Sequence, residues 1–389
     1  MAGRINKREL LRRTLSVSGG IKALESLPVW NGLLVLNYHR IGTPTDPLLD
    51  EALWSATQDD FDRQVKMLKE GFDVIGLSEL PDAIRDVQAA RRLSWQASRF
   101  AMITFDDGYR DNYELAFPVL KANDVHGVFF VATGFIDEPR LAWWDEIAWM
   151  VRSSTRDMIG LPENWLDGQL KLDGSNRRSV INQLLRVYYR LDGSRTEQFL
   201  NRVAEATGSG RAPADTATGQ WMTWAMIREM SDAGMDFGAH TVTHPILANL
   251  TAEEQGIELC ESRLQLERRL DRPVTSLSYP VGKRESFNDE TRAALRHHGR
   301  SAITVGILPV SKSIGTTFLA LPSRAMSRWR ISVLTALYLT SLPGTDSCQK
   351  STGSHEAADC FVMDTGLPAG SPTSGAFRRT VKQLLCRLC

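Results

Sequence analysis

Short apolar segments recur along most of this chain, and stretches with helical spacing of apolar residues separate them. The strand-like segments lie at residues 33–37, 72–75, 100–104, 127–132, 235–239, 276–279 and 301–305. Between two of them, Phe61, Val65 and Leu68 have the spacing of one helix face. Thr251 and Glu254 form the capping-box pattern that opens another helix. Parallel strands need a crossover connection, usually a helix, so this alternation predicts a parallel α/β sheet or barrel.

The alternation is interrupted between about residues 140 and 222. This segment is rich in Trp, Tyr and Leu at helical spacing and is too long for a plain loop, so we expect a helical insertion. After about residue 330 the chain is rich in Ser, Thr, Gly and Pro, which predicts an irregular, poorly ordered tail over 326–389. We therefore expect a basic helical segment at 1–32, a barrel over 33–325 that contains the insertion, and the tail.

The overall charge favours no class of strongly charged partner. The 389 residues contain 46 Lys and Arg and 46 Asp and Glu, so the formal net charge is zero. A nucleic-acid-binding chain would carry a clear positive excess, and we expect no nucleic-acid partner. The five cysteines are odd in number and lie mostly near the C-terminus, which is not the pattern of a disulfide framework.

The N-terminal residues are basic without being strongly apolar. The basic side chains are those of Arg4, Lys7, Arg8, Arg12 and Arg13. No apolar run of signal-peptide length follows them, and no stretch of about 18 uninterrupted apolar residues occurs in the chain. We therefore expect no signal peptide, no transmembrane helix and a cytoplasmic location. Residues 9–27 fit a basic amphipathic helix, which either packs on the domain or makes peripheral contact with an anionic membrane.

Two adjacent carboxylates follow the strand-like segment at 100–104. Asp106 and Asp107 lie where a buried strand meets its loop, and α/β folds place their active centres at such strand ends. Buried carboxylates are costly without a partner. A metal ion held by one of them would leave the other as a general base. The alternative is an ordinary Asp-Gly turn whose first Asp caps a helix.

Histidines follow two other strand-like segments. His240 and His244 come directly after residues 235–239, and two imidazoles four residues apart can converge on one point. With a carboxylate they suit Zn, Fe, Ni or Co, and the alternative is a pair of solvated or core histidines. His39 follows residues 33–37, where it could protonate a leaving amine or serve as a structural histidine in a barrel mouth.

Three motifs occur in an order that resembles the polysaccharide deacetylase family, also called carbohydrate esterase family 4 or the NodB-homology domain. They are residues 104–108 (Thr-Phe-Asp-Asp-Gly), 240–244 (His-Thr-Val-Thr-His) and 279–282 (Tyr-Pro-Val-Gly). The first two are specific in combination, and the resemblance extends over about residues 33–325. It implies a deformed (β/α) barrel of the NodB-homology type, here with a helical insertion. It also implies removal of N-acetyl groups from amino-sugar units of an oligo- or polysaccharide.

The resemblance implies a role for each matching residue. Asp107, His240 and His244 would hold a divalent metal, with Zn first and Co, Ni or Fe as alternatives. Asp106 would be the catalytic base, and the backbone N–H of Tyr109 would stabilise the oxyanion.

The sequence departs from the family pattern in two places. The family's acid histidine, in a Leu-x-His motif near the end of the domain, has no counterpart, because no histidine lies between His298 and His355. Members with an N-terminal Tyr-His-Arg motif bring this histidine from the first strand, which makes His39 the expected acid. The family's Arg-x-Pro-Tyr arginine steadies the catalytic Asp, and residues 278–282 (Ser-Tyr-Pro-Val-Gly) stand in its place. The group that orients Asp106 is therefore open.

We expect aromatic residues to contact the saccharide. Trp143 and Trp144 in the insertion either stack on sugar rings or pack in the core. Tyr279 and Pro280 line the pocket or form only a turn. Bacterial exopolysaccharide, chitooligosaccharide and peptidoglycan-like substrates all fit this chemistry. Two other functions remain as alternatives: an O-acetyl esterase that uses the same residues, and a catalytically degenerate carbohydrate-binding protein of polysaccharide assembly.

Overall fold

The computed structural model describes residues 32–93, 99–162, 165–166, 168–174, 176–297, 303–305 and 334–337. The expected basic helix with its membrane contact lies outside the described residues, as does nearly all of the expected tail. Within the described part, no helix is both long and apolar enough to cross a bilayer.

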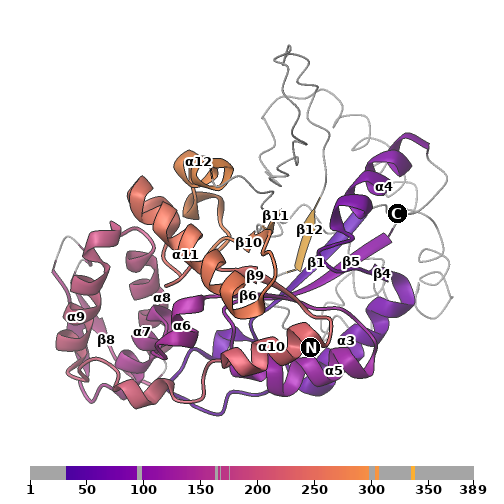
Figure 1. Cartoon of the computed structure of the whole chain (residues 1–389). Coiled ribbons are helices and arrows are strands. Elements are labelled where there is room, and N and C mark those ends of the chain that lie inside the picture. The colour runs from indigo at the N-terminus through magenta and orange to yellow at the C-terminus, as the bar shows by residue number, and fades with distance from the viewer. Residues whose placement is uncertain are drawn as a thin grey trace, which may run out of the picture.

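A curled sheet of eight strands forms the centre of the molecule (Figure 1). Its order is β11-β10-β9-β6-β5-β1-β12, and β4 pairs with the first residues of β5. All pairings are parallel except that of β12 with β1. The strands are β1 (Gly32–Tyr38), β4 (Asp73–Val74), β5 (Arg99–Phe105), β6 (Val128–Val131), β9 (Asp236–Ala239), β10 (Ser276–Ser278), β11 (Ile303–Val305) and β12 (Leu334–Leu337). The predicted parallel α/β fold is confirmed.

The strands are apolar on both faces because each face is covered. Ala101 and Ile103 of β5 belong to the larger hydrophobic core, whereas Met102, between them, belongs to a smaller core with Leu33 and Val35 of β1. Side chains alternate across a strand, so a sheet buried on both faces needs nearly continuous apolar runs. This explains why the strands were visible in the sequence as uninterrupted hydrophobic segments.

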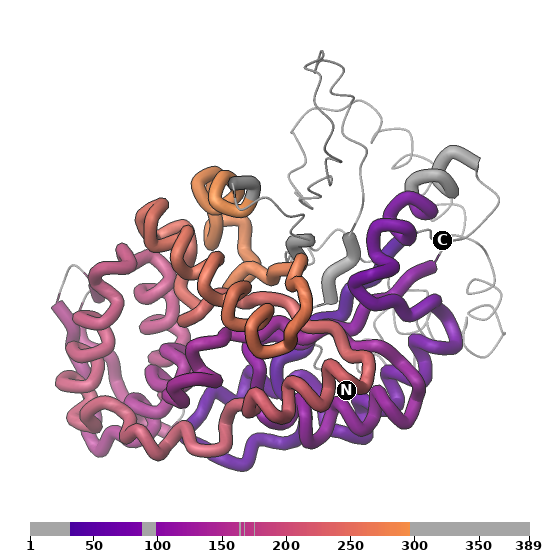
Figure 2. Tube along the Cα trace, viewed as in Figure 1, coloured from indigo at the N-terminus to yellow at the C-terminus, as the bar shows by residue number. Residues whose placement is uncertain are grey.

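Helices connect successive parallel strands and pack beside one another around the sheet (Figures 1 and 2). They are α3 (Gln58–Gly71), α4 (Leu80–Leu93), α5 (Phe117–Ala122), α6 (Thr133–Asp137), α10 (Trp224–Asp232), α11 (Ala252–Leu270) and α12 (Asp289–His297). Helix α11 begins with the predicted capping box, in which the Thr251 hydroxyl accepts from Glu254 N and the Glu254 carboxylate accepts from Thr251 N. A short two-stranded sheet pairs β2 (Arg40–Ile41) with β3 (Trp54–Ala56).

The helical insertion lies at one side of the sheet, on the left of Figure 1. Its helices are α7 (Trp143–Ser153), α8 (Arg177–Tyr188) and α9 (Thr196–Thr207), and a hairpin of β7 (Met158–Gly160) and β8 (Gln169–Lys171) separates the first two. Helix α7 packs against both α8 and α9. The insertion therefore shares its core with the barrel through α7, whose residues are almost all buried.

Strand β12 lies within the segment for which the sequence predicts no regular structure. It runs antiparallel to β1, and Leu33 pairs with Leu337. The edge of β1 is thus covered by a segment that follows the last parallel strand, β11, in the chain.

Candidate metal centre and active site

Asp107, His240 and His244 meet at the carboxyl ends of β5 and β9. Their ligand atoms lie within 4.8 Å of one another, and the Nε2 atoms of both histidines lie 3.4 Å from Asp107 Oδ1. All three side chains are buried. The structure therefore brings together the three residues predicted to bind a metal.

The donor atoms of this cluster fit a divalent cation. Asp107 Oδ1 is buried and has no hydrogen-bond donor within the described residues. His240 Nδ1 lies 2.8 Å from the carbonyl oxygen of Ser278, so its proton is directed there and the lone pair of Nε2 faces Asp107. One carboxylate oxygen and two neutral imidazole nitrogens form a donor set that suits Zn and its neighbours in the transition series.

Electrostatics favour the metal-binding protonation states at two of these ligands. Burial alone would raise the pKa of Asp107, but its contact with His240 and the nearby histidine charges lower that pKa to about 2. Burial lowers the pKa of His244 to about 3. At neutral pH the carboxylate is therefore ionised and the His244 imidazole is neutral, as ligands must be.

The loops of the centre have unusual backbone conformations. Asp107, Thr241, His244 and Val281 have φ values of 76°, 65°, 55° and 65°, and only two other described non-glycine residues have positive φ. Such conformations cost about 1–3 kcal/mol each and persist where surrounding contacts hold them. Their concentration in the loops after β5, β9 and β10 marks this edge of the sheet as the functional one.

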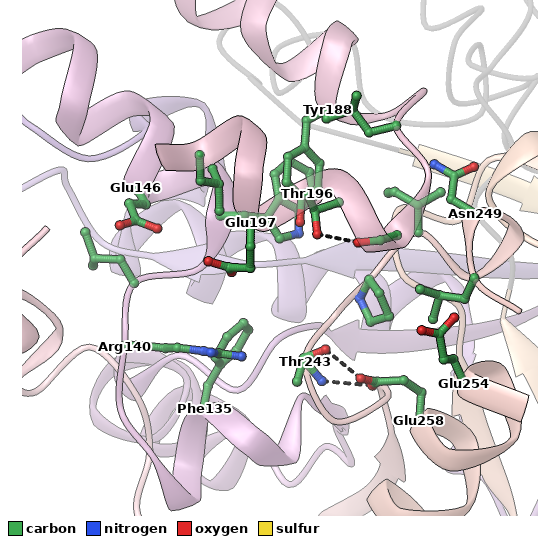
Figure 3. Close-up of a pocket in the computed structure, with 18 of the residues that line it drawn as sticks. Phe135, Arg140, Glu146, Tyr188, Thr196, Glu197, Thr243, Asn249, Glu254 and Glu258 are labelled. Carbon is green, nitrogen blue, oxygen red and sulfur yellow. Dashed lines mark hydrogen bonds between the residues drawn. The ribbon is translucent and has the colours of Figure 1, made fainter. Parts of the chain in front are cut away.

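Glu258 on α11 holds the loop that joins the two histidines. Its Oε2 accepts from the N–H groups of Val242 (2.7 Å) and Thr243 (2.9 Å), and its Oε1 accepts from the Thr243 hydroxyl (2.6 Å) (Figure 3). The Thr241 hydroxyl also accepts from His244 N at 3.1 Å. Glu258 was not predicted from the sequence. Its role depends on the packing of α11 beside β9, which brings Glu258 to the loop that follows β9.

Asp106 lies beside the metal centre with its carboxylate buried. Asn37 Nδ2 donates to Asp106 Oδ2 at 2.8 Å, and the Ser278 hydroxyl lies 3.5 Å from the same oxygen. Burial raises the pKa of Asp106, although the charges of His240 and His39 oppose that shift. Ser278 stands in the motif that replaces the family's arginine, whereas Asn37 was not singled out from the sequence. The sequence feature that could have pointed to Asn37 is its polar side chain at the end of the apolar run of residues 33–36.

His39 follows β1 and is half-buried. Its main chain is fixed on both sides, because His39 N donates to the Ser55 hydroxyl (3.1 Å) and its carbonyl accepts from Asn112 Nδ2 (2.7 Å). The charge of its imidazole is one of those that lower the pKa of Asp106 and of Asp107. Among the described residues, no protein acceptor takes the backbone N–H of Tyr109, the other predicted contributor to the chemistry.

The aromatic residues predicted to contact a saccharide are all buried. Trp143 and Trp144 are each 6% exposed, and Tyr109 and Tyr279 are exposed by 0% and 2%. Tyr279 stacks on Phe287 with a centroid distance of 4.0 Å, and Pro280 is buried beside it. Sugar stacking needs an open ring face, which these side chains lack. Their placement fits the alternative of core packing rather than direct contact with substrate.

The two tryptophans instead support the metal centre from the insertion. Trp143 stacks on Tyr188 (4.2 Å between centroids), and its indole N–H donates to the carbonyl of His244 at 3.0 Å. The Trp144 N–H donates to the Tyr109 hydroxyl at 2.9 Å, and its ring meets that of His244 edge to face. Helix α7 therefore helps to fix the position of a metal ligand.

A pocket of about 300 Å³ lies between the insertion and the loop at 240–244 (Figure 3). None of the three metal ligands lines it. Its carboxylates already have partners, since Glu258 binds the histidine loop, Glu254 caps α11, and Glu146 and Glu197 bind Arg211. Since the carboxylates of this pocket are occupied within the protein, we take the strand ends as the candidate active site.

One family of known proteins is similar to this chain in sequence. The sequence model of the family "Polysaccharide deacetylase" matches residues 96–156 and 183–303, which include Asp106, Asp107 and both loop histidines. YxkH of Bacillus subtilis (strain 168), named for the same family, is 31% identical over 78 residues. That alignment covers 20% of this chain and only 27% of YxkH.

Two solved structures match this chain over most of its length. Streptococcus pyogenes deacetylase PplD is 18% identical with a TM-score of 0.41, and the match covers 70% of this chain and 83% of PplD. IcaB from Ammonifex degensii is 19% identical with a TM-score of 0.43, and the match covers 75% of this chain and 97% of IcaB. Residues 96–156 and 183–303 of this chain thus form a polysaccharide deacetylase domain.

Proposed function

We propose that this protein is a metal-dependent hydrolase that removes N-acetyl groups from amino-sugar units of an oligo- or polysaccharide. The observation that carries the proposal is the buried cluster of Asp107, His240 and His244 with an orphaned carboxylate oxygen. Asp106 precedes Asp107 at the end of β5, and His39 follows β1, the neighbouring strand, which supports a base and an acid on either side of a bound carbonyl group. The donor set favours Zn, and Co, Ni or Fe have compatible preferences.

The cation would supply Lewis acidity toward the acetyl carbonyl and toward water. Asp106 is the base that accepts a proton from water as the water oxygen attacks the carbonyl carbon. The free N–H of Tyr109 donates to the carbonyl oxygen as negative charge develops there. His39 gives a proton to the amide nitrogen as the C–N bond breaks. The products are acetate and a free amine on the sugar.

The test is release of acetate from N-acetylglucosamine oligomers by purified protein. The protein is stripped of metal, resupplied with zinc, cobalt or nickel, and compared with Asp106→Asn. General-base catalysis contributes about 10²- to 10⁴-fold, so we expect Asp106→Asn to lose that factor in kcat while it still binds metal. Full activity in this variant would remove Asp106 from the role of base.

Two other results would replace the proposed reaction. Acetate released faster from an O-acetylated saccharide than from the N-acetylated one would favour an O-acetyl esterase. Tight binding of saccharide without release of acetate from either substrate would favour the carbohydrate-binding alternative. The same protein sample and the same metal serve for all three measurements, so the outcomes are directly comparable.

A further inference from the structure

The hydrogen-bonding groups beside the Asp106 carboxylate all contact the same one of its two oxygens. Both groups near its carboxylate, Asn37 Nδ2 at 2.8 Å and the Ser278 hydroxyl at 3.5 Å, reach Oδ2. No described residue donates a hydrogen bond to Oδ1, and that atom is not among the buried atoms that lack a partner. Of the two groups, only Asn37 lies at the length of a strong hydrogen bond to a charged acceptor.

We infer that Asn37 is the positioning residue of Asp106 and that Thr104 fixes the direction of the Asn37 amide. The inference rests on the proposed function, in which Asp106 is the base. Asn37 holds Oδ2 in place and thereby leaves Oδ1 as the oxygen that receives the proton from water. Asn37 does not itself touch the reacting atoms.

The strand register places these three residues together. Asn37 of β1 pairs directly with Thr104 of β5, so their side chains stand on the same face of the sheet. Asp106 is two residues beyond Thr104, and its N–H donates to the carbonyl of Tyr38 at 2.9 Å, which continues the ladder past the end of the strand. Asp106 therefore points to the same side as Thr104 and Asn37.

The hydrogen-bonding capacity of the three groups sets the direction of the amide. An ionised carboxylate only accepts hydrogen bonds, so the Asn37 NH₂ group must face Asp106 and the amide oxygen must face away. The Thr104 hydroxyl lies 3.0 Å from that oxygen, Oδ1 of Asn37, and 3.2 Å from the Leu36 carbonyl. The hydroxyl can donate to Asn37 Oδ1 and so favours this orientation. The reversed amide would bring its oxygen within 2.8 Å of the carboxylate.

The first experiment measures kcat, KM and zinc content for Asn37→Ala with N-acetylglucosamine oligomers. Loss of one hydrogen bond to a charged group should lower kcat about 10- to 100-fold, while KM and bound zinc stay unchanged. Thr104→Val removes only the hydroxyl and keeps the shape of the side chain. It should lower kcat by a smaller factor, about 2- to 10-fold, because the amide is still present but less constrained.

Asn123→Ala is the matched control. Asn123 Nδ2 donates to Asp62 Oδ1 at 3.0 Å, so this variant removes the same kind of amide-to-carboxylate bond, but between α3 and the end of α5. Its kcat should equal that of the wild-type protein. Thermal unfolding of every variant measures how much of each protein is folded at the assay temperature.

The double variant Asn37→Ala/Thr104→Val separates positioning from general loss of structure. If Thr104 acts through Asn37, removal of its hydroxyl costs nothing further in kcat once Asn37 is alanine. Additive losses in kcat would overturn the inference, as would unchanged kcat in Asn37→Ala. A fall in zinc content that accounts for the loss of kcat would overturn it too.

A crystal structure of Asn37→Ala tests the same inference without any substrate. We expect the Asp106 carboxylate to leave its wild-type rotamer, and an unmoved carboxylate would contradict the role of Asn37. If Asn37→Ala does not fold, the structure of Thr104→Val serves instead, with a reversed or mobile Asn37 amide as the expected result. If the wild-type protein releases no acetate, the proposed function fails on that result, whereas the positioning of Asp106 is still decided by the structures.

Discussion

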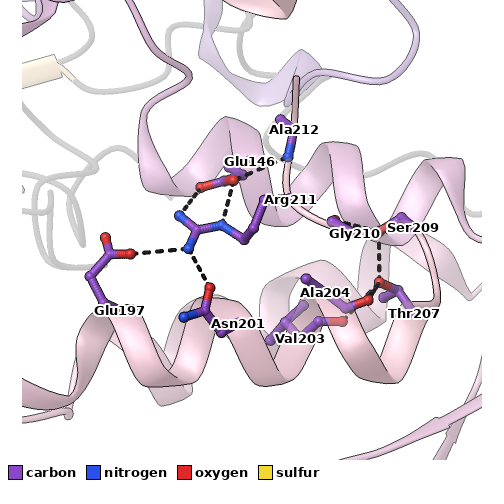
Figure 4. A network of polar contacts seen from close by, with 10 residues as sticks. All are labelled: Glu146, Glu197, Asn201, Val203, Ala204, Thr207, Ser209, Gly210, Arg211 and Ala212. Carbon is purple, nitrogen blue, oxygen red and sulfur yellow. Dashed lines mark hydrogen bonds and ion pairs between the residues drawn. The ribbon is translucent and has the colours of Figure 1, made fainter. Parts of the chain in front are cut away.

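Two clusters of charged side chains in this protein differ in how many of their polar atoms have hydrogen-bond partners. In the insertion, Arg211 forms a two-pronged ion pair with Glu146 (2.7 and 2.9 Å) and also donates to Glu197 (3.0 Å) and Asn201 (2.7 Å) (Figure 4). The backbone N–H of Ala212 donates to Glu146 as well. At the metal centre, by contrast, Asp107 Oδ1 has two imidazole nitrogens at 3.4 Å and no hydrogen bond.

The difference separates a structural cluster from a functional one. A buried carboxylate whose oxygens are all satisfied by a cation and by N–H groups needs nothing from outside. A buried carboxylate oxygen that has imidazole nitrogens beside it and no hydrogen bond can take a cation as its partner. By this criterion the cluster of Glu146 and Arg211 beside the insertion is structural. The cluster around Asp107 at the edge of the sheet is the candidate functional one.

The largest effect on metal binding and activity is expected at Asp107. Asp107→Asn keeps the shape of the side chain but removes the charged ligand, so we expect zinc to be lost and acetate release to fall to the background rate. The lowered pKa of Asp107 means that its neighbours favour the charged carboxylate in the folded protein, so the metal-free variant should be less stable than the metal-free wild-type protein at neutral pH. Zinc content, acetate release and urea unfolding measure the three effects. Retention of one zinc per chain would contradict the assignment of the centre.

The buried carboxylate of Asp145 accepts two hydrogen bonds, and we expect it to make the free energy of unfolding depend on pH. Burial raises its pKa to about 6, although Asp50 N and the Tyr109 hydroxyl both donate to it at 3.0 Å. Between the ordinary pKa near 4 and the raised value, the folded state binds more protons than the unfolded state. The free energy of unfolding therefore falls as the pH rises through this window, by about 3 kcal/mol at most.

Asp145→Asn removes this dependence. The stability of the variant relative to the wild-type protein should rise between about pH 4 and pH 6.5, and urea unfolding at a series of pH values measures the difference. A difference in stability that does not change with pH would show that Asp145 titrates normally in the folded protein.

The smallest effect on stability is expected at the ion pair of Arg211 and Glu146. Glu146→Gln leaves Arg211 without its two-pronged partner, and since Arg211 is about one-third exposed, water screens part of the loss. We expect the free energy of unfolding to fall by about 1–2 kcal/mol while kcat and zinc content stay unchanged. A fall in kcat per folded molecule would indicate that the pocket takes part in the reaction.

Much of the fold and of the candidate site was predictable from sequence because both depend on local patterns. The strands of a sheet buried on both faces are continuous apolar runs, and Asp106, Asp107, His240 and His244 each follow such a run. In a parallel sheet these ends lie at one edge, so their convergence follows from the topology.

The remaining features depend on pairings between distant segments. The role of Asn37 follows from its register opposite Thr104, and that of Glu258 from the packing of α11 beside β9. The sequence could not decide whether Trp143 and Trp144 face a groove or the core, because an aromatic pair at the start of a helix fits both. Strand β12 comes from a segment whose composition is typical of loops, and only its pairing with β1 identifies it.

The hydrogen bond from Trp143 to the carbonyl of His244 has a consequence for protein engineering. A shortened version of this chain cannot begin its deletion at the start of the insertion, because α7 would leave with the group that steadies a ligand loop. Between its two matched segments the family model leaves out residues 157–182, which hold the β7–β8 hairpin and the start of α8. That hairpin is the place to trim the chain, to attach a label or to graft another module.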